Sequence, residues 1–191
     1  MDTITFRPAT LADSQSIASL HTDSWRDVYR SILPDAYLSG PIVGERLSLW
    51  QSRLLSPGVN RRCVFLAESE GMLVGFVCVL LDKEPLWGAC LDNLHVLHKL
   101  RGYGIGRQLF SRATQWVMST EPGWPIHLWV FEANHDARRF YEASRGEVVE
   151  NRLKEAPGGV KINSLRYVWR DLRELLNNLT FRPVGHTVKA R

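Results

Sequence analysis

The sequence predicts an α/β protein, a single domain in which helices cover both faces of a mixed and mostly antiparallel β-sheet. Three observations predict this class. The chain has 191 residues, of which 45% are hydrophobic and 23% are charged, as in an ordinary folded domain. Predicted strands and helices interleave in the order β-α-α-β-β-β-α-β-α-β-β. The central strands are continuous apolar runs, which indicates that the sheet is covered on both faces.

The first elements are a strand and a helix. Thr3–Arg7 alternates between polar and apolar residues, as a short strand does, and Pro8 ends it. Thr10 and Asp13 then form a capping pair, after which apolar residues recur at helical spacing. We therefore expect a helix over about Leu11–Trp25.

A second helix and two strands follow. Apolar residues at helical spacing predict the helix around residues 47–54, before Pro57-Gly58. The strands, Cys63–Glu68 and Met72–Leu81, are joined by a tight turn in which Gly71 can take a positive φ. We expect these two strands to pair.

The second half of the chain begins with a strand at Ala89–Val96, a glycine-rich loop and a helix that ends at Pro122-Gly123. A further strand, Ile126–Phe131, precedes a short helix that Asn134 caps and Gly146 ends. The last two strands are predicted at Glu147–Arg152 and Ser164–Arg170, on either side of Pro157-Gly158-Gly159.

Charge and composition argue against several classes of function. The net charge is +4, and three basic residues lie in the last ten, which contain no acidic residue. We expect a single domain over residues 1–179 with a basic tail at 180–191, and no nucleic-acid binding. No apolar run approaches the roughly 18 residues of a membrane span and no secretory signal is evident, so we expect no membrane partner and a cytoplasmic location.

The cysteine and histidine patterns predict neither disulfides nor a metal site. Cys63, Cys78 and Cys90 are odd in number and lie in apolar runs without CxxC spacing, which favours buried, reduced thiols. His95 and His98 share a segment but lack a third ligand nearby. We therefore expect no metal.

The strongest functional signal is the turn Arg101–Gly106. A strand ends, the chain turns through three glycines and a helix begins, so several N–H groups and the positive end of a helix dipole meet at one point. Glycines allow a phosphate group to approach the backbone closely. The dinucleotide and Walker A fingerprints do not fit, which leaves the kind of phosphate ligand open.

The turn matches the pattern R/Q-x-x-G-x-G/A, with Arg101, Gly104 and Gly106 in the required places, and resembles motif A of the GNAT superfamily of acyl-CoA-dependent N-acyltransferases. Downstream, Asn134-x-x-Ala-x-x-Phe-Tyr141 looks like motif B of that family. The opening Phe6-Arg7-Pro8-Ala9 and the segment from His21 through Ser24, Trp25 and Arg26 to Tyr29 are similar to ribosomal-protein and polyamine acetyltransferases. The resemblance extends from Ile4 to Trp169.

The resemblance implies a GNAT fold in which the parallel strands Ala89–Val96 and Ile126–Phe131 splay apart. The pantetheine of acetyl-CoA, the implied co-substrate, would pair with the backbone of Leu94 and Val96 as an added strand would. The amides of the glycine turn would hold the pyrophosphate. The residues implied in binding the cofactor are Leu94, His95, Val96, Arg101, Gly102, Tyr103, Gly104, Ile105, Gly106, Arg107 and Asn134.

The resemblance assigns the acid that protonates the departing thiolate to Tyr141. Candidate bases are Asp92, His95, Glu132 or a chain of waters, and Asp92 can instead form an ion pair or anchor the substrate. Strict alternation places Asp92 opposite His95, unless a bulge breaks the register. Trp25 and Tyr29 are candidates for the wall of the acceptor site, or for packing against the sheet.

The sequence therefore predicts transfer of an acetyl group to a primary amine by direct attack. The acceptor is either a small molecule such as a polyamine or the amino group of a protein N-terminus. The alternative is a non-catalytic, regulatory module that binds acyl-CoA without turnover. The sequence leaves open whether the protein forms a homodimer.

Overall fold

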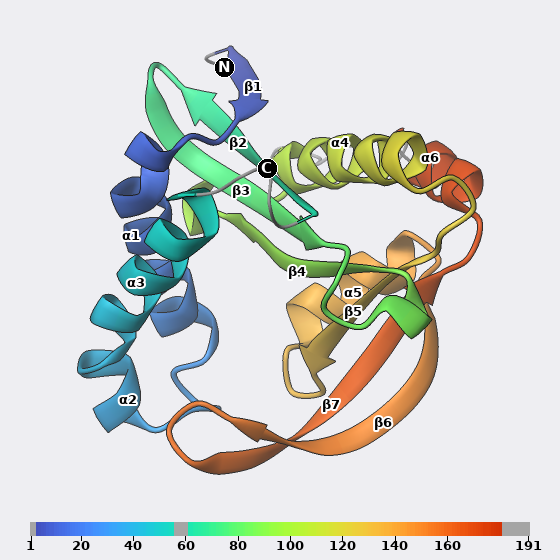
Figure 1. The fold of residues 1–191 in the computed structure, drawn as a ribbon. Coiled ribbons are helices and arrows are strands. Elements are labelled where there is room, and N and C mark those ends of the chain that lie inside the picture. The colour runs from blue at the N-terminus through green and yellow to red at the C-terminus, as the bar shows by residue number, and fades with distance from the viewer. Residues whose placement is uncertain (1–2, 56–60, 181–191) are drawn as a thin grey trace, which may run out of the picture.

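In the part of the chain that the structure describes, seven strands form one mixed sheet in the order β1-β2-β3-β4-β5-β7-β6 (Figure 1). The structure is a computed structural model that describes residues 3–55 and 61–180. All neighbouring strands are antiparallel except β4 and β5, which are parallel. The strands are β1 (Ile4–Pro8), β2 (Arg62–Ser69), β3 (Met72–Leu80), β4 (Ala89–Val96), β5 (Ile126–Phe131), β6 (Glu147–Ala156) and β7 (Val160–Trp169). The predicted α/β class, with a mostly antiparallel sheet and one parallel pair of strands, is confirmed.

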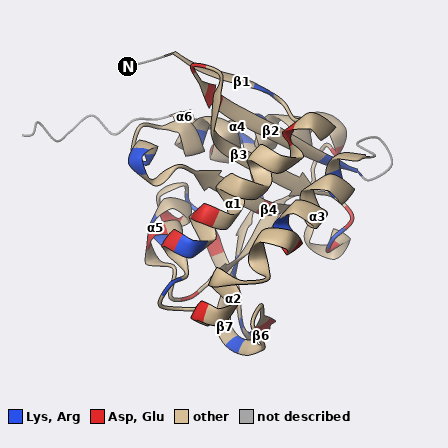
Figure 2. Cartoon of the chain, turned by 90° about the vertical axis from the view of Figure 1, so that its left-hand side faces the viewer, with Lys and Arg blue, Asp and Glu red and all other residues tan. Residues whose placement is uncertain are grey.

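Helices cover both faces of this sheet, as the continuous apolar runs predicted. Helices α1 and α3 lie on one face, and α4 with α6 on the other (Figures 1 and 2). None of the described helices is long and apolar enough to cross a membrane. The helices are α1 (Ser14–Val28), α2 (Asp35–Ser39), α3 (Ile42–Leu55), α4 (Ile105–Thr120), α5 (His135–Ala143) and α6 (Leu172–Thr180).

The side chains of β3 show how one strand serves two cores. Val77 and Val79 are buried against α4, together with Leu109 and Phe110. The alternate residues, including Phe76, are buried against α1 and α3. Each fully buried side chain of this size contributes about 1.5–3 kcal/mol to folding. A strand with both faces buried reads as an unbroken apolar run, as this one does.

Strands β4 and β5 pair only at their beginnings. The register joins Ala89 to Ile126 and Cys90 to His127 and then stops. Beyond Cys90 the edge of β4 that faces β5 has no strand partner among the described residues. This is the splayed pair that the resemblance implied, and its free backbone groups must find another partner or water.

Several local predictions are confirmed. The capping pair forms, because the Thr10 amide donates to Asp13 Oδ2 at 2.7 Å. Gly71 takes a φ of +76° in the turn between β2 and β3. The three cysteines are free and buried. The predicted stop at Pro57-Gly58 and the tail after Thr180 lie outside the described residues.

Three local expectations differ from the structure. Gly146 does not supply the left-handed residue after α5, since Arg145 does so with a φ of +60°. Gly146 is required by packing instead, because a Cβ there would lie 2.6 Å from the Trp169 ring. Helix α2 was not predicted, and neither was α6, although Leu172, Leu175 and Leu179 have helical spacing.

Candidate active site

The glycine turn is shaped by backbone conformations that only glycine adopts readily. Gly102 has a φ of +84° and Gly104 a φ of +83°. A Cβ placed on either residue would meet no protein atom within 4 Å, so both face open space. Gly106 lies where α4 approaches Val96 and the Phe140 ring. The turn is therefore a cradle whose inner surface is backbone.

The first turn of α4 adds unpaired donors to this cradle. The first hydrogen bond of the helix runs from the Gln108 amide to the Gly104 carbonyl, at 3.1 Å. The amides of Ile105 and Gly106 therefore have no acceptor within the helix. No acidic residue lies in this turn to neutralise the helix dipole. These donors suit a diphosphate, which fits the cofactor that the sequence implied.

The side chains of the turn point in different directions. Ile105 is buried in the core, whereas Tyr103 is 53% exposed. Arg101 reaches back towards the end of α1, where its Nη2 lies 3.3 Å from Asp27 Oδ2. The backbone of the turn is therefore better placed than its side chains to bind a phosphate. Arg101 adds positive charge next to the turn.

Strand β4 contains a bulge at Asp92. Cys78 pairs with Asn93 and Val79 with Leu91, so Asp92 is the extra residue in the ladder. The bulge places Asp92 and His95 on the same face of the sheet, towards α1 and α3, while Leu94 packs against the other core. The strict alternation expected from the sequence is therefore wrong beyond Asp92.

Asp92 is the centre of an ion-pair cluster. Its Oδ2 lies 2.7 Å from Arg53 Nη2, and its Oδ1 contacts Lys83 Nζ. Arg53 also donates to Asn93 Oδ1 at 2.9 Å, so it holds both residues of the bulge. Burial raises the pKa of Asp92, but the charges of Arg53 and Lys83 outweigh burial and hold it below its usual value. These contacts favour the ion-paired role over that of a base.

We expect Asp92→Asn to lower the free energy of unfolding by roughly 2–3 kcal/mol at neutral pH, because two cations lose their carboxylate. The loss is smaller than for a fully buried pair, since Lys83 is 46% exposed. Because the pKa of Asp92 is lowered in the folded protein, its ion pairs stabilise the fold fully at pH values above the pKa of the unfolded chain, about 3.9. This stabilisation is lost as the pH falls through the pKa of the folded state. Urea unfolding from pH 7 to 3 should show the difference between variant and wild type narrowing below about pH 4.

His95 lies beside Asp92 in an apolar pocket. Its Nδ1 is 2.8 Å from Ser24 Oγ, and its ring lies 4.8 Å from that of His21. Burial, with the charges of Arg101 and Arg46, lowers the pKa of His95 to about 3. The ring is therefore neutral at physiological pH and a weak proton acceptor. Because its side chain points towards α1, only its backbone faces the splayed edge.

Tyr141 lies on α5, on the side of the sheet that α4 covers. Its ring packs against those of Tyr167 and Trp169, with centroids 5.7 and 5.8 Å away. Burial raises the pKa of Tyr141 well above its usual value, and Tyr29 and Tyr167 act in the same direction. The phenol therefore stays protonated across the physiological range and is able to donate a proton.

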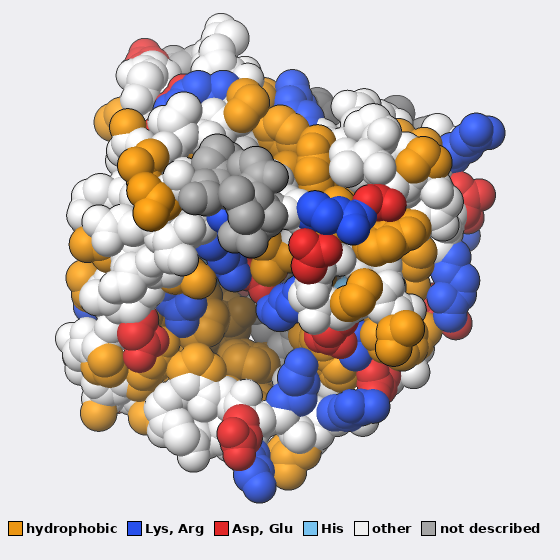
Figure 3. Space-filling model, in the orientation of Figure 1, with side chains coloured by type: hydrophobic (Ala, Val, Ile, Leu, Met, Phe, Trp, Pro, Cys, Tyr) orange, Lys and Arg blue, Asp and Glu red, His pale blue; other side chains and the backbone are white. Residues whose placement is uncertain are grey.

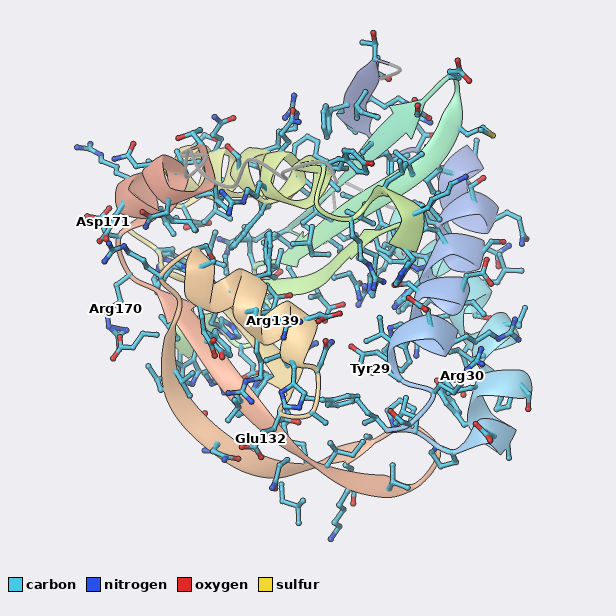
Figure 4. All side chains as sticks on the ribbon, turned by 180° about the vertical axis from the view of Figure 1, so that it is seen from behind. Tyr29, Arg30, Glu132, Arg139, Arg170 and Asp171 are labelled. Carbon is cyan, nitrogen blue, oxygen red and sulfur yellow. The ribbon has the colours of Figure 1, made fainter. Side chains whose placement is uncertain are left out.

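Tyr29 and Asn134 face each other across the split between β4 and β5. Asn134 caps α5, because its Oδ1 accepts from the Ala137 amide at 3.2 Å. The Asn134 side chain also lies near the Tyr29 hydroxyl, where it opposes the rise in the pKa of Tyr29 that burial causes. Figure 4 shows Tyr29 at the end of α1 and Glu132 on the loop after β5. The cap predicted for Asn134 is confirmed, and this residue also joins two elements distant in sequence.

Trp25 and Tyr29, the residues suggested for the wall of the acceptor site or for packing, lie on the last turn of α1 and just after it. Their rings are 5.0 Å apart, and the Tyr29 ring lies 5.1 Å from that of Phe131 on β5. Both residues also pack against the small core around Leu33 and Tyr37. The two roles proposed for them from the sequence, site wall and packing, are therefore compatible.

Sequence reasoning missed several charged residues of this region. Arg166 on β7 is 3% exposed and pairs with Glu84 at 2.6 Å and Glu150 at 2.8 Å. Its guanidinium lies 4.3 Å from the ring centroids of both Trp87 and Trp129. These partners are up to 82 residues apart, so no local pattern in the sequence signals the cluster.

The described residues contain no group of three or more histidine, cysteine or acidic side chains that could hold a metal ion.

Sequence comparison places this arrangement among known proteins. The model of the acetyltransferase (GNAT) family matches residues 22–146. An uncharacterized N-acetyltransferase of Bacillus subtilis, YuaI, is 28% identical over 176 residues, which cover 90% of this chain and 96% of the relative. A probable N-acetyltransferase of Mycobacterium tuberculosis, Rv2775, is 30% identical over 139 residues, covering 73% and 77%.

Solved structures share the fold at low identity. The PaiA N-acetyltransferase of Thermoplasma acidophilum, solved with coenzyme A, has a TM-score of 0.66 and 16% identity over 85% of this chain and 98% of its own. YncA of Salmonella typhimurium, solved with acetyl-CoA, has a TM-score of 0.64 and 16% identity over 88% and 94%. At this level of identity the likeness establishes the fold.

Proposed function

Because the chain belongs to the GNAT family of acetyltransferases, we propose that it transfers an acetyl group from acetyl-CoA to a primary amine. The acceptor is a small molecule or the amino group of a protein N-terminus. The observation that carries the proposal is the split in the sheet, where β4 has an unpaired edge and leads into the glycine cradle at Gly102 and Gly104. The phenol of Tyr141, which its raised pKa keeps protonated, supports the proposal further.

On the cofactor side, the chain would bind by its backbone. Leu94 and Val96 lie on β4 beyond its last pairing with β5, where they can hydrogen-bond a pantetheine chain as an added strand. The amides at the start of α4 would bind the diphosphate. Both interactions are supported by backbone groups, on β4 and at Ile105 and Gly106, that pair with no other backbone group in the part of the chain that the structure describes.

The thioester of acetyl-CoA supplies the acyl group. When an amine attacks it directly, a C–N bond forms, the C–S bond breaks, and the nitrogen loses a proton while the thiolate gains one. Tyr141 would give its proton to the thiolate and regain one from water before the next turnover, and its raised pKa keeps the phenol protonated between turnovers. A thiol has a pKa of about 8.5, so the thiolate is a good leaving group that needs only partial proton transfer from this weak acid.

The proton of the acceptor ammonium would leave to water. Asp92 is engaged by two cations and the pKa of His95 is about 3, so neither is suited to strong general-base catalysis. We therefore expect kcat/KM to rise with pH up to the pKa of the free acceptor amine. Pre-steady-state and steady-state rates between pH 6 and 10 would measure this profile.

Asp92→Asn tests the assignment of the base. The variant should keep the shape of the wild-type pH profile if Asp92 is only an ion-paired anchor. If the variant instead loses the rise with pH, Asp92 is the base. The profile of a variant remote from the site, Arg173→Gln, provides the control, since Arg173 is exposed on α6.

The function itself is tested by two measurements on the full chain. Calorimetry should detect binding of acetyl-CoA, and a thiol reagent should detect release of coenzyme A that depends on an added amine. Binding without release across a broad panel of amines would favour the non-catalytic module. Absence of acetyl-CoA binding by folded protein would refute the proposal.

A further inference from the structure

The face of the sheet covered by α1 and α3 contains a hollow that adjoins the split between β4 and β5. Figure 3 shows this hollow with apolar side chains in its floor and several lysine or arginine side chains around it. The rings of Trp25, Tyr29 and Phe131 follow one another across this region, with centroids 5.0 and 5.1 Å apart. Tyr29 lies near enough to Tyr141 to contribute to the raised pKa of the Tyr141 phenol. The hollow is therefore where an acceptor would reach the phenol.

Most of the charges around this region are paired with each other. Asp92 is shared by Arg53 and Lys83, Glu84 pairs with Arg166, and Glu150 is shared by Arg152 and Arg166. Each of these carboxylates therefore already has at least one cation. Among the described cations on this side that form no ion pair with a carboxylate are Arg46 on α3 and Lys154 on β6, and both lie on an aromatic ring.

Arg46 is held in place without a counter-charge. Its guanidinium carbon lies 4.1 Å from the Trp25 ring centroid, and its Nη2 donates to the Tyr37 hydroxyl at 3.0 Å. That hydroxyl donates in turn to Glu45 Oε2 at 2.6 Å, so Glu45 reaches Arg46 only through Tyr37. The buried Nε of Arg46 has no hydrogen-bond partner in the described structure. Because that Nε is buried, the Nη groups of the guanidinium are the part of Arg46 that would bind a carboxylate.

Lys154 on β6 also contacts an aromatic ring and forms no ion pair in the described structure. Its Nζ lies 3.9 Å from the centroid of the Trp129 ring. Burial lowers the pKa of Lys154, although the nearby Glu84 acts in the other direction. An ammonium on an aromatic face, without an ion pair, can still accept an anionic ligand.

We propose that this hollow binds its acceptor by a carboxylate, so that the substrate is a small apolar amino acid rather than a polyamine. The inference rests on the proposed function, because it places the acceptor amine beside Tyr141. Arg46 would bind the carboxylate, Lys154 would add positive charge, and the rings of the floor would contact the apolar side chain. A polycation would meet the same uncompensated charges and be repelled.

Binding tests the inference without any need for turnover. Protein saturated with coenzyme A is titrated with L-amino acids that have apolar side chains, and tryptophan fluorescence is followed. The paired probes are L-phenylalanine, phenethylamine, which lacks only the carboxylate, and spermidine. We expect an amino acid of this set to bind at least tenfold more tightly than its decarboxylated amine and than spermidine. Equal or tighter binding of the amines would overturn the inference.

Variants test which residue binds the carboxylate of the acceptor. Arg46→Gln should weaken binding of the amino acid by about 10- to 100-fold, the equivalent of one lost charge-assisted hydrogen bond, and should leave phenethylamine unaffected. Arg46→Lys should recover part of the loss. Arg173→Gln is the matched control, since it removes an exposed arginine on the other side of the sheet. If Arg46→Gln does not fold, Lys154→Gln tests the same selectivity.

The failure of this inference differs from the failure of the proposed function. A protein that releases coenzyme A with phenethylamine or spermidine but neither binds nor acetylates amino acids keeps the proposed function and refutes the carboxylate site. Unchanged amino-acid affinity in both Arg46→Gln and Lys154→Gln would refute it as well.

Discussion

Replacing Tyr141 by phenylalanine is expected to lower kcat for amine-dependent release of coenzyme A by roughly a hundredfold. This is the lower end of the range for general acids, because the thiolate is a good leaving group. Affinity for acetyl-CoA should not change, since the cradle and the β4 edge bind by backbone. Steady-state rates with a thiol reagent, together with calorimetric titration of acetyl-CoA, measure both quantities.

Tyr167→Phe is the matched control for this variant. It removes a neighbouring phenol whose hydroxyl donates to Glu142 Oε1 at 2.8 Å rather than facing the split. We expect a loss of about 1 kcal/mol in stability, from one hydrogen bond, and an unchanged kcat. If Tyr141→Phe kept the wild-type kcat, or if both variants lost it equally, Tyr141 would not be the acid.

Replacing Gly104 by alanine should reduce the affinity for acetyl-CoA at least about a hundredfold. The new Cβ would occupy the open side of the cradle and keep the diphosphate from the amides, and each lost hydrogen bond to a charged group is worth about 1.5–3 kcal/mol. The φ of +83° also strains alanine, which costs about 1–2 kcal/mol in stability. Calorimetry and urea unfolding separate the two effects.

Gly159→Ala is the matched control, because it introduces similar backbone strain at a glycine outside the cradle. Gly159 has a φ of +74° in the turn between β6 and β7, and a Cβ there would also meet nothing within 4 Å. This control should lose a similar amount of stability and bind acetyl-CoA normally. Equal affinity in the two variants would show that the glycine turn does not hold the diphosphate.

Much of the fold follows from short-range patterns. Apolar periodicity indicated the seven strands and the long helices, because which face a side chain presents depends on its nearest neighbours along the chain. Helix α6 was not predicted, although Leu172, Leu175 and Leu179 have the spacing of one buried helix face. Helix α2 has only five residues and too little periodicity for such a prediction.

For the candidate site, the sequence by itself determined the glycine cradle, the cap at Asn134 and the position of Tyr141 on a helix, because each depends on residues within a turn or two of one another. Only the tertiary structure decided the environment of Asp92. The bulge in β4 places Asp92 on the same face of the sheet as His95. Arg53 and Lys83, which belong to two other segments of the chain, form ion pairs with Asp92 there. Charges respond to distance in space and not in sequence. For the same reason, the unpaired Arg46 and Lys154 became visible only once the chain was folded.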